Sequence, residues 1–394
     1  MNKRIAQALA LILSRDIKNA KRNNAVLLML PMGLGDAVLY LDTIDYYFEK
    51  YKNNHVYLMT TSVADEVFKF SRPNLKYSFI EYNPIKMDTN VNYFLDLYDR
   101  VGSIYYEEVV YPLRGFLTMD LLYGKIKSDR KITIDTLKDE ASKSRKVKMR
   151  DFLIRNTDII TFLPSDMDLI RYARIAEKVC GIPIKARLPH IKINKTNCDK
   201  YCQISIGSSR PEKCWPIDKY SDVTKFILRN TEYNVVFTGS NEDGIAVNRI
   251  IDSIGKFEHR IINKCGQTSL IELFSIISNA SLLIGGDSGP IHVSVACDTP
   301  AICIVGGWDY ERMYPYRVEI EEVGRTAPIV VNTGIKSCYR CLLLHGSRGA
   351  TNPVCSKMIK SGKPCLCIDD ISSELVIDSI KKELLKRGEI LCHF

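Results

Sequence analysis

The sequence has no apolar run long enough to cross a membrane. The run near its start, Ala8–Leu13, is much shorter than the roughly 20 residues that a spanning helix needs. No small-x-small cleavage site follows this run, so a secretory signal peptide is not predicted. These absences indicate a protein that is soluble or peripheral to a membrane.

Two nucleotide-binding signatures are missing as well. The chain has no GxxxxGK[ST] loop, which excludes a P-loop enzyme. Its first half has no GxGxxG followed by an acidic partner for a ribose, which argues against a dinucleotide-dependent dehydrogenase. Hydrophobic residues make up 46% of the chain and charged residues 26%, and this balance excludes a disordered protein.

The positive charge is concentrated in one half of the chain. The length of 394 residues favours two domains, and the formal net charge is +9. Residues 1–195 carry 32 Lys and Arg against 23 Asp and Glu, whereas residues 196–394 carry 23 of each. The whole surplus therefore lies in the first half, which we expect to meet an anionic partner.

A basic amphipathic segment opens the chain. Ile5, Leu9, Ile12 and Leu13 share one helical face, and Lys and Arg residues flank it on both sides. A helix of this kind suits the surface of an anionic membrane. It also suits packing against its own domain, so both interpretations stay open.

Both halves have the pattern of alternating strands and helices. In the first half the predicted strands are Ala25–Leu30, His55–Thr60 and Tyr105–Tyr111. In the second half they are Gln203–Ile206, Tyr233–Thr238, Arg260–Asn263, Ser281–Ile284 and Ala301–Val305, with helices between them. Strands that end in glycine and lead into helices indicate repeated βα units and a parallel sheet. The charged run 138–150 is interpreted as a solvated helix or loop, with a binding site as the alternative.

This pattern predicts two Rossmann-like α/β domains, residues 1–195 and 196–394. We expect them to face each other across a cleft that binds ligand at the carboxyl ends of the strands. The hinge is expected near Ile191–Tyr201. A Cys-rich segment, residues 338–367, belongs to the second domain, and the final helix, Ser372–Lys386, can cross back to the first.

Three strand-to-helix turns of the second half have the parts of a diphosphate site. Ser208 lies in a turn of small residues ahead of Lys213. Asp287–Pro290 opens a helix with small residues and proline, which leaves backbone N–H groups to face an anion. Gly306–Gly307 lets a third backbone segment approach closely. Each turn alone is ordinary, but three at the same end of one sheet predict a nucleotide-diphosphate site.

Four motifs follow one another along nearly the whole chain. They are Gly35-Asp36, Lys213-Cys214-Trp215-Pro216, Gly266-Gln267-Thr268-Ser269-Leu270 and Gly286-Asp287-Ser288-Gly289-Pro290-Ile291-His292. This set resembles the ADP-heptose heptosyltransferases of glycosyltransferase family nine. The resemblance implies a type-B glycosyltransferase fold and an inverting reaction without a catalytic metal. It also implies a nucleotide-diphosphate sugar as donor, with ADP-heptose as the leading choice.

The resemblance implies catalytic roles for two of these residues. Asp36 would be the general base that takes the proton from the acceptor hydroxyl as it attacks the anomeric carbon. The alternative is that Asp36 caps a helix beginning at Ala37. Lys213 would neutralise the charge that develops on the leaving diphosphate.

The remaining matches are implied to bind the donor. His292 would orient or contact the diphosphate, and Asp243 matches the ribose-binding acid, with Glu242 as the alternative. The donor-binding set is Gly35, Ser208, Lys213, Glu242, Asp243, Asp287, Ser288, Gly289, His292, Gly306 and Gly307.

The acceptor side is less defined. Asp42 stands where family members usually carry proline, which hints at a different acceptor surface. The region 82–150 gives no clear match to the acceptor-binding basic residues of the family. Charge alone makes acceptor-binding candidates of Arg114, Lys143, Arg145 and Lys146.

The cysteine count is odd, at 13, and no export signal accompanies it, so a reduced cytoplasmic setting is expected. Five cysteines cluster as C-x2-C-x13-C-x9-C-x-C: Cys338, Cys341, Cys355, Cys365 and Cys367. Four thiolates can hold a structural zinc or iron, with Cys365 and Cys367 competing for one place. The pattern resembles the cysteine motif of some family members, including the branch that heptosylates autotransporter adhesins. Reduced, partly buried thiols are the alternative.

The leading hypothesis is heptose transfer from ADP-heptose to a cell-envelope glycan, the lipopolysaccharide core. The partners would then be the nucleotide sugar and an anionic glycan or glycolipid acceptor, with the protein in the cytoplasm or peripheral on the inner face of the membrane. Three alternatives remain: transfer of another activated sugar or transfer to a protein, a nucleotide-sugar epimerase, and a nucleic-acid-binding metalloprotein. The basic residues are not interleaved with aromatics, so no nucleic acid is expected.

Overall fold

The structure is a computed structural model of the chain. It describes residues 20–113, 117–135, 157–162, 166–196, 200–208, 210–308, 310–318, 325, 327–334, 339 and 353–389. The chain divides into two compact units. One gathers Met1–Ala37, Thr43–Pro164 and Arg171–Lys185, and the other gathers Val38–Asp42, Ser165–Ile170 and Ala186–Phe394. The change of unit after Lys185 precedes the hinge expected at Ile191–Tyr201, and the cleft between the domains stays a prediction.

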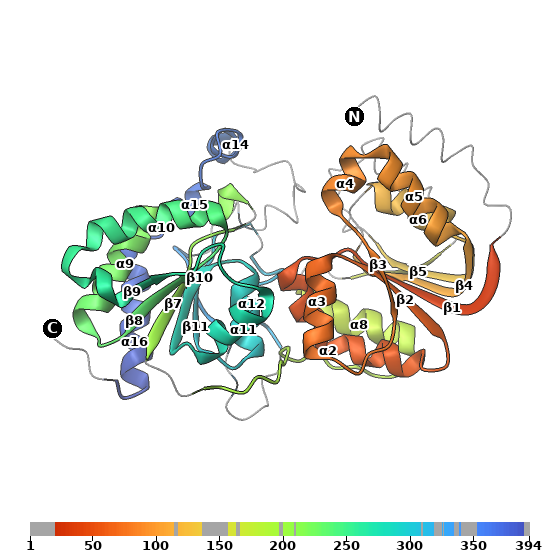
Figure 1. Cartoon of the computed structure of the whole chain (residues 1–394), viewed down its shortest axis with the longest axis horizontal. Helices are drawn as coiled ribbons and strands as arrows, with labels where there is room; N and C mark the ends of the chain where they lie inside the picture. Colours follow the sequence, from red (N-terminus) through yellow and green to blue (C-terminus); the bar gives the residue numbers. More distant parts are fainter. Residues whose placement is uncertain are drawn as a thin grey trace. The chain divides into compact units, whose positions relative to one another are not determined.

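The first unit is built on a parallel six-stranded sheet. Its elements, with the helix that follows the last strand, are β1 (Lys21–Leu30), α2 (Leu34–Lys50), β2 (His55–Thr60), α3 (Ser62–Ser71), β3 (Ser78–Glu81), α4 (Pro84–Thr89), α5 (Val91–Gly102), β4 (Ile104–Tyr111), α6 (Leu117–Lys125), β5 (Ser128–Ile134), β6 (Asp158–Ile160) and α8 (Asp168–Cys180). The strand order is β3-β2-β1-β4-β5-β6. Helices α2 and α8 cover one face of this sheet, and α4, α5 and α6 cover the other (Figure 1).

Strand β1 shows why the apolar pattern predicted its position. Every residue from Ala25 to Leu30 is buried, as expected for a strand in the middle of a parallel sheet with helices on both faces. The strand also continues back to Lys21 across an irregularity in its pairing with β4, where Asn24 has a φ of 48°. The exposed polar residues of that extension carry no apolar pattern, so the sequence predicted only the buried part.

The second unit holds another parallel six-stranded sheet. Its elements are β7 (Tyr201–Ser205), η1 (Pro211–Lys213), α9 (Ile217–Asn230), β8 (Asn234–Thr238), α10 (Asn241–Ile254), η2 (Gly255–Arg260), β9 (Ile261–Asn263), α11 (Leu270–Asn279), β10 (Leu282–Gly286), α12 (Gly289–Ala296), β11 (Ala301–Ile304), β12 (Ile329–Val331), α14 (Pro353–Lys360), α15 (Leu366–Asp369) and α16 (Ser373–Lys386). The strand order is β12-β11-β10-β7-β8-β9. Helices α9, α10 and α16 cover one face, and α11 and α12 cover the other (Figure 1).

The two sheets share one topology. In each, the first strand of the unit lies at the centre and the order of the strands reverses beside it, between β1 and β4 and between β7 and β10. Ligands of doubly wound sheets bind outside the carboxyl ends of the strands at such a reversal. Asp36 follows β1, whereas Ser208 and Asp287 follow β7 and β10. The topology therefore places the predicted groups at the strand ends where doubly wound sheets usually bind ligands.

The final helix packs in the second unit, and its expected return to the first stays a prediction. Helix α16 lies against α9, β11 and β12. Its buried side chains, Val376, Ile380 and Leu384, belong to the same hydrophobic core as the strand residues of the second sheet. Because their spacing places them on one helical face, burial of that face holds the helix on the sheet that precedes it in the chain.

Within the described part of the chain, no helix combines the length and the apolar character that crossing a membrane requires. The amphipathic segment at residues 5–13 lies outside the described residues.

Candidate functional site

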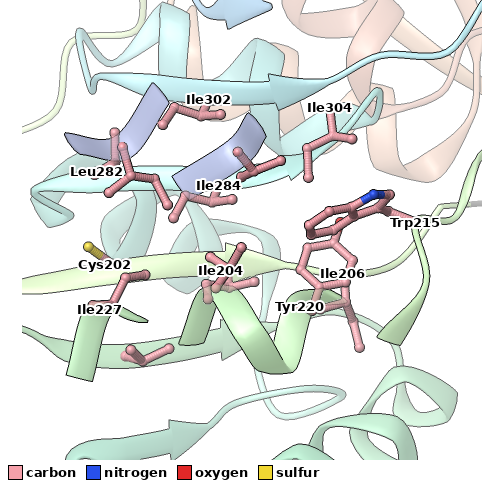
Figure 2. Packing of buried hydrophobic residues seen from close by; sticks show 14 of the residues in the cluster. Cys202, Ile204, Ile206, Trp215, Tyr220, Ile227, Leu282, Ile284, Ile302 and Ile304 are labelled. Carbon is pink, nitrogen blue, oxygen red and sulfur yellow. The ribbon is translucent and has the colours of Figure 1, made fainter. Parts of the chain in front are cut away.

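The turn after β7 carries Ser208 and Lys213 and is held by an anchored tryptophan. The Trp215 Nε1–H donates to the Ile371 carbonyl at 2.9 Å, and the indole meets the Tyr220 ring edge-on with centroids 4.8 Å apart. Both rings are buried, and Figure 2 shows them together at the end of the strand isoleucines. Lys213 is therefore presented from a rigid segment, because Trp215 lies two residues after it.

Lys213 forms a buried ion pair with Asp287. Strands β7 and β10 are neighbours in the sheet, with Ser205 opposite Gly285. The Lys213 Nζ lies 2.8 Å from the Asp287 Oδ2, and their side chains are only 13% and 7% exposed. A charge pair so far out of water is screened little by salt. The ion pair thus brings Lys213, the predicted phosphate-binding lysine, into contact with Asp287, the first residue of the β10–α12 turn.

The start of α12 offers backbone donors beside this pair. Ser288 is the N-cap in an extended conformation, and its Oγ donates to the Gly286 carbonyl at 3.1 Å instead of capping the helix. Gly289 is the first helical residue, and the proline that follows it has no N–H. The first N–H groups of a helix have no partner within the helix, and the helix dipole favours an anion there. Phosphate binding at this turn stays a prediction, and the geometry of the helix start is compatible with it.

His292 lies on α12 and is only 3% exposed. Its Nδ1 is hydrogen-bonded to the Tyr316 hydroxyl, and its ring stacks on those of Tyr314 and Tyr316, with centroids 5.2 and 5.9 Å away. Burial raises the pKa of both tyrosines well above the usual range, so their hydroxyls stay protonated. The Tyr314 hydroxyl lies 3.2 Å from the other ring nitrogen, Nε2. The structure therefore holds His292 in one ring orientation.

The two acids predicted as ribose ligands differ in their surroundings. Asp243 forms a capping box at the start of α10, where its Oδ2 accepts hydrogen bonds from the Ser240 N–H at 2.7 Å and the Ser240 hydroxyl at 3.0 Å. The same carboxylate fills the space beside Gly207 and Gly239, where any Cβ would clash with it. Glu242 is exposed, and hydrogen bonds from its own N–H and from Ser240 lower its pKa. Of the two, Glu242 presents its carboxylate to solvent.

The glycine pair after β11 packs closely against other parts of the second unit. A Cβ on Gly306 would lie 2.7 Å from Ile368, and a Cβ on Gly307 would lie 2.5 Å from the Tyr339 ring. The Gly307 N–H donates to the Cys367 Sγ at 3.1 Å. The close approach made possible by these glycines is therefore with the protein's own chain, and donor contact at Gly306 and Gly307 stays a prediction.

Asp36 lies in the first unit, half-buried in the first turn of α2. The helix begins at Leu34 with Gly33 as its N-cap, so the alternative interpretation of Asp36 as the cap is wrong. The Tyr172 hydroxyl of α8 donates to the Asp36 Oδ1 at 3.0 Å. Gly35 precedes Asp36 in the same turn, and its contact with the donor stays a prediction.

Three of the five clustered cysteines are described, and all three are buried: Cys355, Cys365 and Cys367. The Cys365 N–H donates to the Glu212 carbonyl at 3.0 Å, next to Lys213 in the chain. Within the part of the chain that the structure describes, no group of three or more His, Cys, Asp or Glu residues is arranged to hold a metal ion.

Six predicted positions fall outside the described residues. They are the acceptor candidates Arg114, Lys143, Arg145 and Lys146 and the cysteines Cys338 and Cys341.

Sequence reasoning missed the tyrosines that hold the predicted site residues. Tyr172 lies on a helix whose pattern is an ordinary amphipathic one, and no local signal links it to Asp36. Tyr314 and Tyr316 stand on either side of a proline, a few residues after the Gly306–Gly307 pair. This spacing was the one feature of the sequence that could have drawn attention to them. Contacts of this kind depend on the tertiary fold, so they have no sequence motif.

Residues 173–339 match the family model described as glycosyltransferase family 9 (heptosyltransferase), so the resemblance inferred from the motifs is confirmed for this stretch of the chain. Lipopolysaccharide heptosyltransferase 3 of Escherichia coli K12 is 34% identical over 125 residues. The aligned stretch covers 31% of this chain and 35% of that relative, so the chain matches about a third of the relative's length.

Solved structures share the fold over almost the whole chain. The E. coli ADP-heptose lipopolysaccharide heptosyltransferase II has a TM-score of 0.64 at 15% identity, and the match covers 92% of this chain and 99% of that one. The iron-containing dodecameric glycosyltransferase TibC of enterotoxigenic E. coli has a TM-score of 0.50 at 13% identity, covering 94% of this chain and 78% of that one. The predicted fold, two Rossmann-like units of the type-B glycosyltransferase class, is confirmed.

Proposed function

We propose that the protein is an inverting glycosyltransferase that moves a heptose from ADP-heptose to an acceptor of the lipopolysaccharide core. One observation carries the proposal: the buried Lys213–Asp287 pair lies beside the start of α12, at the topological switch point of the unit that matches family 9. A diphosphate needs a cation and free backbone N–H groups at such a point. The choice of ADP-heptose as the donor rests on the names of the similar proteins reported above.

The proposed reaction uses the protein's own groups on both reacting ends of the donor. Asp36 takes the proton from the acceptor hydroxyl while the hydroxyl oxygen attacks the anomeric carbon from the side opposite the diphosphate. The bond to the diphosphate breaks, and ADP leaves with the extra negative charge. Lys213 and the N–H groups at the start of α12 stabilise that charge, so the proposal calls for no catalytic metal.

For the nucleoside end we propose Glu242 as the ribose ligand in preference to Asp243. A carboxylate accepts hydrogen bonds from a ribose diol only if its oxygens can reach it. The Asp243 Oδ2 already accepts a hydrogen bond from Ser240, and the carboxylate packs against Gly207 and Gly239. Glu242, one residue earlier in the same helix turn, is exposed. The exposure of Glu242 and the capping contacts of Asp243 support this choice between the two acids.

The test is a mass-spectrometric screen of nucleotide sugars, followed by turnover with the one that binds. We expect ADP-heptose to bind, to raise the melting temperature and to be consumed only when a heptose-accepting core glycan is present. A donor of another sugar, a protein acceptor, or conversion of the nucleotide sugar without any acceptor would replace the proposal with transfer of another sugar, protein glycosylation or epimerisation respectively.

The proposed base has its own test. Asp36→Asn keeps the size of the side chain and removes the basic oxygen pair, so transfer should fall by about 10²-fold or more. Binding of ADP-heptose should persist, because all of the proposed donor-binding residues except Gly35 lie in the second unit. Normal turnover by this variant would eliminate Asp36 as the base.

We also propose a structural zinc or iron at the cysteine cluster, held by Cys338, Cys341, Cys355 and one of Cys365 and Cys367. The support is the burial of the three described thiols, an N–H···S hydrogen bond from Gly307 to Cys367, and the iron in the TibC structure. Bound metal would hold this segment against the Lys213 loop. Elemental analysis of the purified protein decides, and a protein without zinc and iron would refute the site.

The setting we propose is the cytoplasm, with the basic first unit and the segment at residues 5–13 bringing the enzyme to the inner face of the membrane. Sedimentation with vesicles that contain anionic lipid tests this, and truncation of residues 1–19 is the matched variant.

A further inference from the structure

Asp36 receives a hydrogen bond from a helix far along the chain. The Tyr172 hydroxyl on α8 donates to the Asp36 Oδ1 at 3.0 Å, a normal length for an O–H···O bond. Tyr172 is only 2% exposed. A buried phenol with this geometry fixes both its own orientation and that of the group it touches.

Helix α8 is held firmly in the position that makes this contact. Leu169, Ala173, Ala176 and Val179 are all 3% exposed or less and recur every three or four residues with Tyr172, so one whole face of the helix is buried. A second bond ties α8 to α2 near their last residues, where the Lys50 Nζ donates to the Val179 carbonyl at 2.7 Å. Tyr172 therefore approaches Asp36 from a helix that is attached to α2 at two points.

We propose that Tyr172 is the positioning residue for the catalytic carboxylate of Asp36. This inference rests on the proposed role of Asp36 as the general base. The terminal torsion of an aspartate is broad and offers many orientations at similar energy. A hydrogen bond to one carboxylate oxygen selects one of them and so sets the direction in which the acceptor proton is taken. Misplacement of a catalytic group by about 1 Å can cost about 10²-fold in rate.

The hydroxyl is the part of Tyr172 that matters, so Tyr172→Phe is the test variant. The phenyl ring keeps the packing of α8, whereas the donor to Asp36 is lost. We expect kcat to fall by about ten-fold, the equivalent of about 1.4 kcal/mol in the barrier, while the KM for ADP-heptose and the melting temperature stay close to those of the parent protein. This split between kcat and KM is one that a merely structural tyrosine would not produce.

The matched control is Tyr106→Phe. Tyr106 is also fully buried in the first unit, and its hydroxyl donates to the Val101 carbonyl at 3.1 Å, so the chemical change is the same away from Asp36. We expect this variant to keep its kcat. An equal loss of kcat in both variants would overturn the proposal, because it would point to a general effect of losing a buried hydroxyl.

A double-mutant cycle separates failure of this inference from failure of the proposed function. If Tyr172 acts through Asp36, Tyr172→Phe should add nothing to the loss already caused by Asp36→Asn. Full additivity of the two losses, or an unchanged kcat in Tyr172→Phe alone, would refute the positioning role and leave Asp36 as the base. Normal turnover by Asp36→Asn would instead eliminate Asp36 as the base, and the absence of any heptose transfer by the parent protein would refute the proposed function.

Discussion

Adjacent residues in one helix turn can have separate tasks, and Glu242 and Asp243 illustrate this at the scale of single residues. Asp243 satisfies the N–H and hydroxyl of Ser240 and fills the space left by two glycines, all of which stabilises the start of α10. Glu242 makes its hydrogen bonds within the same turn but stays exposed at the strand ends where the nucleoside is proposed to bind.

This difference predicts opposite outcomes for two alanine variants. Asp243→Ala should lower the free energy of unfolding by about 1 kcal/mol, because the variant loses the hydrogen bonds that Asp243 accepts from the N-cap residue Ser240. Glu242→Ala should leave stability nearly unchanged and raise the Kd for ADP. Chemical denaturation and calorimetric titration of both proteins measure the two effects. A weaker ADP affinity confined to Asp243→Ala would assign the ribose to Asp243.

Lys131 is a second residue whose surroundings predict a measurable effect. Burial lowers its pKa to about 8, and its Nζ donates to the carbonyls of Tyr123 and Gly124 at 2.8 and 3.1 Å. An unfolded lysine titrates near 10.4. Between pH values of about 8 and 10.4 the folded protein has lost a proton that the unfolded chain still carries, so this group makes stability rise with pH.

The prediction is tested by comparing the parent protein with Lys131→Met. The free energy of unfolding of the parent, relative to that of the variant, should increase between pH 8 and 10 by an amount on the order of 2 kcal/mol. Urea denaturation at several pH values measures this difference, in which the titration of all other groups cancels. Parallel curves for the two proteins would mean that Lys131 titrates normally.

At the scale of elements, α16 is the last helix of the second unit and packs against its hydrophobic core. The helix follows the last strand of the sheet and buries Leu384 in the core while its neighbour Leu385 is 55% exposed. Two leucines next to each other in one helix thus have opposite surroundings, since successive residues point about 100° apart.

Leu384→Ala should therefore lower the free energy of unfolding by about 2–5 kcal/mol, as large-to-small changes in a core do. Leu385→Ala, with the same change in size and helix propensity, should cost less than about 1 kcal/mol. Thermal or urea denaturation of the pair tests whether α16 packs on α9 as described. Equal effects would show that the helix is not docked on this core.

Elements also differ in how far the sequence predicts them. The strands of the second sheet have apolar runs that end in glycine, and nearly all of them were predicted within two or three residues. Strand β5 was missed because Arg130 and Lys131 interrupt its pattern. Both charges are satisfied by distant partners: Arg130 pairs with Glu108 and Asp158, and Lys131 caps the end of α6. Partners of this kind cannot be inferred from the residues beside the strand.

At the scale of the whole molecule, the net positive charge lies in the half of the chain that is proposed to bind the acceptor, and the half proposed to bind the donor has no net charge. The entire surplus of +9 belongs to residues 1–195, whereas the proposed donor site relies on one buried lysine and backbone N–H groups. Salt screens exposed charges much more than buried ones.

Raising the NaCl concentration should therefore raise the KM for a phosphorylated acceptor several-fold while the KM for ADP-heptose changes little. Steady-state kinetics between low and about 0.3 M salt measures both constants. An acceptor KM that is insensitive to salt would mean that the basic surplus does not contact the acceptor.

Composition, apolar periodicity and the turn motifs determined a large part of this protein: the parallel α/β class, the two-unit organisation, the resemblance to family 9 over residues 173–339, and the strand ends that carry Asp36, Lys213 and Asp287. These features are local, because a strand that ends in a glycine turn is encoded by consecutive residues. Tertiary structure alone decided which acid of Glu242 and Asp243 is engaged in capping, which unit holds α16, and that Tyr172 bonds to Asp36. Each of these depends on residues far apart in the chain, and their contact arises only when packing brings the elements together.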